Sequence, residues 1–97
     1  MTAEESNRFI DCVSHEDCTI RLYGHIYWCN GLARYPDGQY HIHVYELDKD
    51  DIYKWVRDIL DYGADSYVDC MKHFVEDKYW DGKSFWEVAP DMEWIDL

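Results

Sequence analysis

Hydrophobic and polar residues alternate along much of the stretch from residue 18 to residue 47, and a period of two is typical of β-strands. We predict three antiparallel strands over residues 18–23, 25–35 and 40–47, each with one apolar face. Clear core-facing positions occur in the first and third of these strands. They are Cys18, Ile20, Leu22, Tyr40, Ile42 and Val44.

Two glycine-containing segments punctuate these strands. Asn30-Gly31 interrupts the second apolar run, and because apolar residues continue beyond it, the pair predicts a bulge or short break inside one strand. Pro36-Asp37-Gly38 predicts a turn, since proline fixes φ and glycine accepts the left-handed conformation. The second and third strands are therefore expected to form a hairpin.

Outside the strands, apolar residues recur at steps of three and four, which predicts amphipathic helices. A capping box formed by Thr2 and Glu5 begins a helix that ends near Val13. Further helices are predicted over residues 51–62 and, with Ser66 as the cap, over 66–77. The apolar stripe of the segment 51–62 consists of Ile52, Trp55, Val56, Ile59 and Leu60.

The predicted fold is a single α+β domain over residues 1–97, because a chain of this length supports one modest core. A three-stranded antiparallel sheet is covered on one face by helices 51–62 and 66–77, with the N-terminal helix at its edge. Ser84 is expected to cap a short helical turn. The tail 92–97, a short strand or an extended segment, is expected to dock on the body because it is rich in large apolar side chains.

The composition predicts a core rich in aromatic rings, and the sequence also bears on the cellular location. Five Trp, nine Tyr and three Phe predict that large aromatic rings supply much of the buried surface. The acidic N-terminal stretch has no apolar run typical of a signal peptide, and no segment has the length of a membrane span. We therefore expect a cytoplasmic protein.

Negative charge is concentrated in the second half of the chain. The net charge is −12, and residues 45–97 hold fifteen of the 21 acidic residues but only six of the nine Lys and Arg. Such a surface repels nucleic-acid phosphates and attracts basic patches of other proteins. The composition excludes direct nucleic-acid binding and favours a basic protein partner, with solubility as the alternative role of the charge.

The cysteines and histidines suggest two candidate metal sites, neither of which we favour. Cys12, His15 and Cys18 could bind zinc together with Cys29, but the spacing is not that of a standard finger, and reduced cysteines buried in the core are the preferred interpretation. We expect no metal and no cofactor.

His41 and His43 are next-but-one neighbours on one strand face, about 7 Å apart, and such a pair can ligate a metal or relay protons. The alternative is an open polar-aromatic sheet face that grips a partner. No phosphate-binding glycine loop, Walker lysine or Ser-His-Asp signature is present, so we expect a protein without enzymatic activity. The other residues expected on this face are Arg21, Tyr23, Tyr27 and Tyr45.

Three segments carry a resemblance to a known group of proteins: FIDCVSHEDCTIRLYG (9–24), PDGQYHIHVYEL (36–47) and the acidic segment 48–77. Their order of elements in a small acidic chain is similar to that of certain phage-encoded anti-CRISPR proteins. One such family places acidic residues where the basic groove of a CRISPR nuclease would hold PAM DNA. The tail DGKSFWEVAPDMEWIDL (81–97) resembles instead the tails of small uncharacterised proteins of Gram-positive bacteria and their mobile elements.

These observations predict an acidic protein-binding module that occupies the nucleic-acid site of a nuclease or another DNA-binding protein. The alternative is an accessory or structural protein of a bacterial or mobile-element operon that acts through its aromatic sheet face, for example as a homodimer. The residues expected to contact the partner are Asp48, Asp50, Asp51, Asp61, Asp65, Asp69, Tyr45 and His43.

Overall fold

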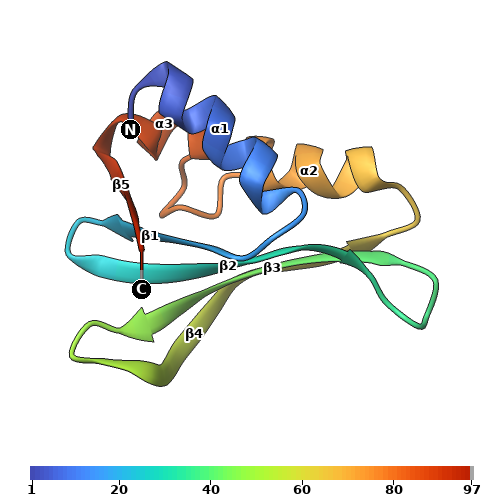
Figure 1. The fold of residues 1–97 in the computed structure, drawn as a ribbon, viewed down its shortest axis with the longest axis horizontal. Helices are drawn as coiled ribbons and strands as arrows, with labels where there is room; N and C mark the ends of the chain where they lie inside the picture. The colour runs from blue at the N-terminus through green and yellow to red at the C-terminus, as the bar shows by residue number, and fades with distance from the viewer. Residues whose placement is uncertain (97) are drawn as a thin grey trace.

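A computed structural model describes residues 1–96 and contains, within them, a five-stranded antiparallel sheet with helices over one face (Figure 1). The α+β class is therefore confirmed. The elements in chain order are α1 (Ala3–Val13), β1 (Cys18–Leu22), β2 (His25–Arg34), β3 (Tyr40–Asp48), β4 (Asp51–Ala64), α2 (Tyr67–Glu76), α3 (Phe85–Val88), the 3₁₀ turn η1 (Ala89–Asp91) and β5 (Met92–Ile95).

Helix α1 begins with the predicted capping box. The backbone N–H of Glu5 donates to Thr2 Oγ1 over 3.1 Å, and the backbone N–H of Thr2 donates to Glu5 Oε1 over 3.0 Å. The backbone hydrogen bond from Thr2 holds the pKa of the Glu5 carboxyl below its usual value. The capping predicted for α2 is also confirmed, because Ser66 Oγ accepts from the backbone N–H of Asp69 over 3.3 Å.

The strand order is β4-β3-β2-β1-β5, and all neighbouring strands are antiparallel. Tyr23 and Gly24, with φ of 50° and 81°, form the tight turn between β1 and β2. Gly38, with φ of 84°, lies in the predicted turn between β2 and β3. The register of β2 against β3 shifts between Asn30 and Ala33, which confirms the predicted irregularity inside one strand.

The prediction of a three-stranded sheet is wrong, and the predicted helix over 51–62 is strand β4. Strand β4 has 14 residues whereas its partner β3 has nine, and the surplus is absorbed at three register shifts. The extra residues break the two-residue alternation of a strand, and the steps of three and four between Ile52, Trp55 and Ile59 do not mark one face, because Ile59 packs on the core whereas Trp55 is exposed. Pairing with β3 decided the conformation.

The C-terminal segment adds the other new strand. Strand β5 pairs with β1, and Thr19 Oγ1 donates to the carbonyl oxygen of Ile95 over 2.7 Å. The N-terminal amine of Met1 donates to the carbonyl oxygens of Ala89 and Met92 over 2.8 and 2.6 Å. The expected docking of the tail is thus confirmed for residues 92–95, and the N-terminus lies beside the start of β5 (Figure 1).

A cluster of phenylalanine rings joins the helix layer to the sheet. Phe9, Phe74 and Phe85 come from α1, α2 and α3, and all three are fully buried. Their ring centroids lie 5.5 to 6.5 Å apart, and Trp94 of β5 meets Phe9 edge-on at 5.2 Å. Helix α1 lies over β1 and β2. The prediction that it lies at the edge of the sheet is wrong.

Within residues 1–96, no helix combines the length and apolar character needed to cross a bilayer.

The substitution Phe9→Ala should lower the free energy of unfolding by about 3–5 kcal/mol, because it leaves a cavity among the phenylalanine rings. Tyr53→Ala is the matched control, since it removes a ring that is 94% exposed and should change the free energy by about 0.5 kcal/mol or less. Urea denaturation of the three proteins measures both. Equal losses would contradict the assignment of Phe9 to the core.

Candidate functional site

The β3–β4 hairpin lies at one edge of the sheet and bends away from the helix layer (Figure 1). The register shifts account for the bend, because bulges increase the local twist of a strand. They also leave large side chains near the tip of the hairpin in solvent: Tyr53 is 94% exposed, Trp55 56% and Val56 41%. We name these three residues the tip apolar group.

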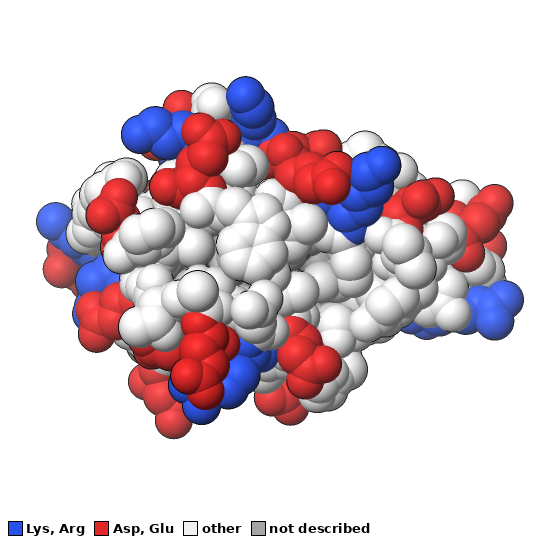
Figure 2. Space-filling view, turned by 90° about the horizontal axis from the view of Figure 1, so that it is seen from above, with Lys and Arg blue, Asp and Glu red and all other residues white. Residues whose placement is uncertain are grey.

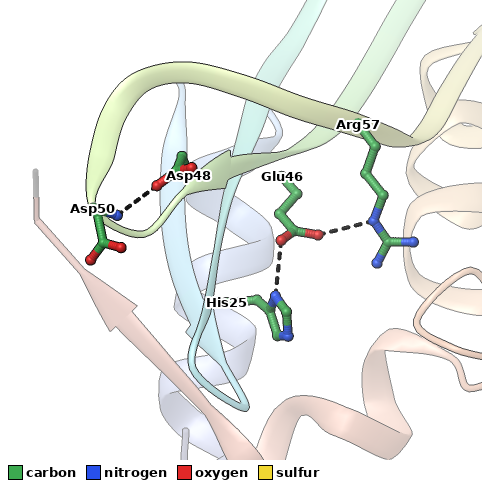
Figure 3. A network of polar contacts seen from close by, with 5 residues as sticks. All are labelled: His25, Glu46, Asp48, Asp50 and Arg57. Carbon is green, nitrogen blue, oxygen red and sulfur yellow. Dashed lines mark hydrogen bonds and ion pairs between the residues drawn. The ribbon is translucent and has the colours of Figure 1, made fainter.

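Aspartates shape the tip itself. The backbone N–H of Asp50 donates to Asp48 Oδ1 over 2.8 Å (Figure 3), and that of Tyr53 donates to Asp51 Oδ1 over 3.1 Å. These side chains hold the reversal of the chain in place, as aspartates do in turns. The result is a negatively charged tip next to the tip apolar group.

Glu46 anchors the hairpin to the rest of the sheet. Its Oε1 accepts from Arg57 Nε on β4, and its Oε2 lies against His25 Nδ1 on β2, both over 2.9 Å (Figure 3). Burial opposes the charge of Glu46, but the hydrogen bonds from His25 and Arg57 outweigh it and hold its pKa below the usual value. One buried carboxylate thus links three strands.

A second group of residues lies on the open sheet face, which no helix within residues 1–96 covers. Asp58 Oδ1 accepts from Trp55 Nε1 over 2.9 Å and lies 2.8 Å from His43 Nε2. The hydrogen bond from Trp55, followed by that from His43, holds the pKa of Asp58 below its usual value. Because an ionised carboxylate only accepts hydrogen bonds, His43 Nε2 is the donor in this contact. We define the open-face cluster as His43, Tyr45, Trp55, Asp58 and Asp61.

The open-face cluster also contains a possible metal-ligand set. His43, Asp58 and Asp61 bring one ligand atom each to within 4.8 Å of one another, and no other group of three does so among residues 1–96. One imidazole and two carboxylates suit Zn²⁺ or Mn²⁺. His43 and Asp58 already share a hydrogen bond, so these polar groups do not need a metal ion to have a partner. The sequence also suggested a zinc site made of Cys12, His15, Cys18 and Cys29. Within residues 1–96, no three of these residues bring their ligand atoms this close together.

The predicted partner-binding residues fall into three places. His43, Tyr45 and Asp61 lie together in the open-face cluster. The others occupy the two ends of the hairpin, because Asp48 pairs with Asp51 at one end and Tyr40 with Ala64 at the other. Asp48, Asp50 and Asp51 form the tip, whereas Asp65, which follows Ala64, and Asp69 in α2 lie towards the far end.

The predicted aromatic face is partly right. Arg21, His41 and Tyr45 have the outward phase expected of them, and His41 Nε2 lies 2.9 Å from Asp37 Oδ2, so His41 and His43 each have a separate carboxylate. The prediction that Tyr27 lies on this face is wrong: Tyr27 is 5% exposed and packs edge-on against Trp80, with ring centroids 5.1 Å apart. Because Tyr27 is the partner of the buried Ile20, its side chain faces the core.

Sequence reasoning missed Trp55 and Asp58 as surface-cluster residues because it assigned them to two faces of a helix. The signal that could have found them is the content of aromatic and β-branched residues in 51–62, which favours a strand. Bulges concealed the alternation that would have supported that interpretation.

The helix side of the molecule has a different character. Figure 2 shows acidic and basic side chains interspersed around the margin of this side, with uncharged atoms at its centre. The hairpin region 48–65 has six aspartates and three basic residues, one of which is the Arg57 paired with Glu46. The hairpin differs from the helix side in placing aspartates beside Tyr53, which is 94% exposed, and this combination makes it the better candidate for a protein-binding site.

No protein-family model, curated protein or solved structure matches this chain.

We expect the free energy of unfolding to fall as the pH drops below about 4.5, because Glu46 has a lower pKa in the folded chain than its usual 4.5 and the unfolded chain then binds the proton more readily. This contribution is complete above the unfolded pKa and is lost as the pH falls through the folded one. Glu46→Gln should have a smaller pH slope between about pH 5 and 3. Urea denaturation across this range measures it, and an unchanged slope would contradict the anchoring role.

Proposed function

We propose that this protein is a non-enzymatic binding module whose β3–β4 hairpin contacts a basic surface of another protein. The observation that supports it best is the exposure of Tyr53 and Trp55 beside the aspartates of the tip, Asp48, Asp50 and Asp51. Exposed aromatic groups of this size at a sheet edge are costly for solubility, and a partner that covers them removes that cost.

The two kinds of side chain would contribute differently to binding. Carboxylates at the tip attract a basic surface and raise the association rate. Aromatic residues bury a large area once in contact and slow dissociation. The Glu46 anchor and the hydrogen bonds around Asp58 hold the hairpin in one conformation, which reduces the entropy lost on binding.

For the partner, we propose a protein whose basic surface normally holds nucleic-acid phosphates, such as a nuclease or another DNA-binding protein. The net charge of −12 disfavours direct binding to nucleic acid but suits competition with it for a basic groove. The resemblance in charge to small acidic anti-CRISPR proteins makes a CRISPR nuclease one candidate; the order of elements does not support it, because residues 51–64 form a strand.

A second candidate function is self-association through the edge of the sheet. Strand β4 is an edge strand with the tip apolar group on it, and a second copy could pair with this edge or cover its side chains. This version corresponds to a small accessory protein that works as a homodimer.

The first proposal predicts that the triple variant D48N/D50N/D51N and the double variant Y53A/W55A each weaken partner binding by about tenfold or more, or about 1.4 kcal/mol. Asn keeps a side-chain oxygen that can accept the hydrogen bonds of the turn, so the fold should be retained. The measurement captures partners from a host lysate on the wild-type protein, purifies the one retained and titrates it against each variant at about 50 and 500 mM salt.

The charge-matched control is E4Q/D11N/E76Q, which removes three exposed carboxylates from α1 and α2. It should bind as the wild type does. Duplex DNA should compete with the module if the contacted surface is a nucleic-acid site. Equal losses in the tip variant and this control, or binding that ignores salt, would refute the proposal.

The self-association candidate predicts a dimer whose dissociation constant changes little with salt and rises in Y53A/W55A. Sedimentation equilibrium of the wild type and of this variant decides the matter. A monomer at every concentration tested would exclude it.

A further inference from the structure

Two thiols that the proposed function does not use lie against each other. Cys12 is in the last turn of α1, Cys18 is the first residue of β1, and their Sγ atoms are 3.0 Å apart. Both are free thiols. We propose that Cys12 and Cys18 are a modification site, which a low-molecular-weight disulfide such as oxidised glutathione converts to an intrachain disulfide.

The backbone between the two cysteines already has the required reversal. The backbone N–H groups of His15 and Glu16 both donate to the carbonyl oxygen of Cys12, over 3.1 and 2.9 Å, and turn the chain back from α1 towards β1. A disulfide needs a sulfur separation of about 2.05 Å, so the sulfurs have about 1 Å left to close. Side-chain rotation and a small shift of the loop can supply this movement.

Access to oxidant differs between these thiols and the other two. Cys12 is partly exposed, and with Cys18 it lines a surface hollow of about 500 Å³ whose walls include Trp28 and Trp94. Cys29 and Cys70 are fully buried. A small disulfide molecule can therefore reach the Cys12–Cys18 pair in the folded protein. Cys29 is the cross-strand partner of Cys18, which makes it the competing partner to be tested.

The chemistry balances with one oxidant molecule. The Cys12 thiolate attacks one sulfur of the oxidant, forms a mixed disulfide and releases one thiol of glutathione. The Cys18 thiolate then attacks Cys12 Sγ, forms the intrachain disulfide and releases the second molecule of glutathione as its thiol. The protein loses two protons and two electrons, and the oxidant is reduced to two thiols. Burial and the hydrogen bond to Glu16, over 2.8 Å, raise the pKa of Cys12, so the first step is slow.

The bond would close a loop that already organises strand β2. Asp17 in this loop accepts from the backbone N–H of Gly31 over 2.7 Å and from Trp28 Nε1 over 3.2 Å. A side chain at Gly31 would meet the backbone of Glu16 at 2.5 Å, so the loop lies directly on the bulge of β2. Oxidation would therefore restrain Trp28, on the open sheet face, together with the loop.

The test incubates the reduced, purified protein with excess oxidised glutathione and then alkylates it. Digestion at Glu16 and Arg21 places Cys12, Cys18 and Cys29 in separate peptides, which are analysed by mass spectrometry. We expect the protein to lose the mass of two hydrogens and to yield peptides linked through Cys12 and Cys18. The melting temperature should rise by about 10 °C, the effect of closing a short loop in a domain of this size. Dithiothreitol should reverse both changes.

Two variants and one internal control sharpen the test. Cys12→Ser should form no intrachain link, whereas Cys70→Ala, the matched loss of another thiol, should form it normally. Cys29 and Cys70 should resist alkylation until denaturant is added, which shows that the bond forms in the folded chain. Glutathione adducts without an intrachain bond, a bond to Cys29, or full alkylation of both thiols in the wild type would each overturn the proposal, even if Cys12→Ser did not fold.

Discussion

Hydrogen bonding between β3 and β4 is the interaction on which the rest of this structure depends. It extends the sheet beyond the strands that alternate cleanly and creates an edge bent away from the helices. The mismatch between 14 residues in β4 and nine in β3 is accommodated as bulges, which blunt an edge that would otherwise invite uncontrolled pairing. The same bulges leave Tyr53 and Trp55 in solvent.

A buried carboxylate makes this edge rigid. Glu46 would be costly to bury alone, and its contacts with Arg57 and His25 offset that cost only if the three strands keep their register. On the other side of the hairpin, Asp58 performs a similar role in solvent by joining Trp55 to His43. The hairpin therefore presents its aromatic and acidic groups in one arrangement, which would favour the proposed binding.

The opposite side of the molecule is held by different means. Phenylalanine rings from three helices pack over the sheet, and β5 pairs with β1 next to the anchored N-terminal amine. The loop that follows α1 connects this side to the open face, because Asp17 binds the bulge of β2 and the ring of Trp28. The thiols of Cys12 and Cys18 lie at the base of that loop. The proposed oxidation site and the proposed binding hairpin thus lie in separate parts of the molecule.

The sequence by itself determined the local features: the Thr2–Glu5 capping box, the turn at 36–38, the bulge near Gly31 and the strands between residues 18 and 47, because each depends on neighbouring residues. Part of the candidate site, His43 and Tyr45 on one face, followed from the same alternation. Only the tertiary structure decided that 51–64 is a strand and that 92–95 completes the sheet. Both conformations come from hydrogen bonds to distant strands, and irregular pairing removes the periodicity by which a strand is recognised.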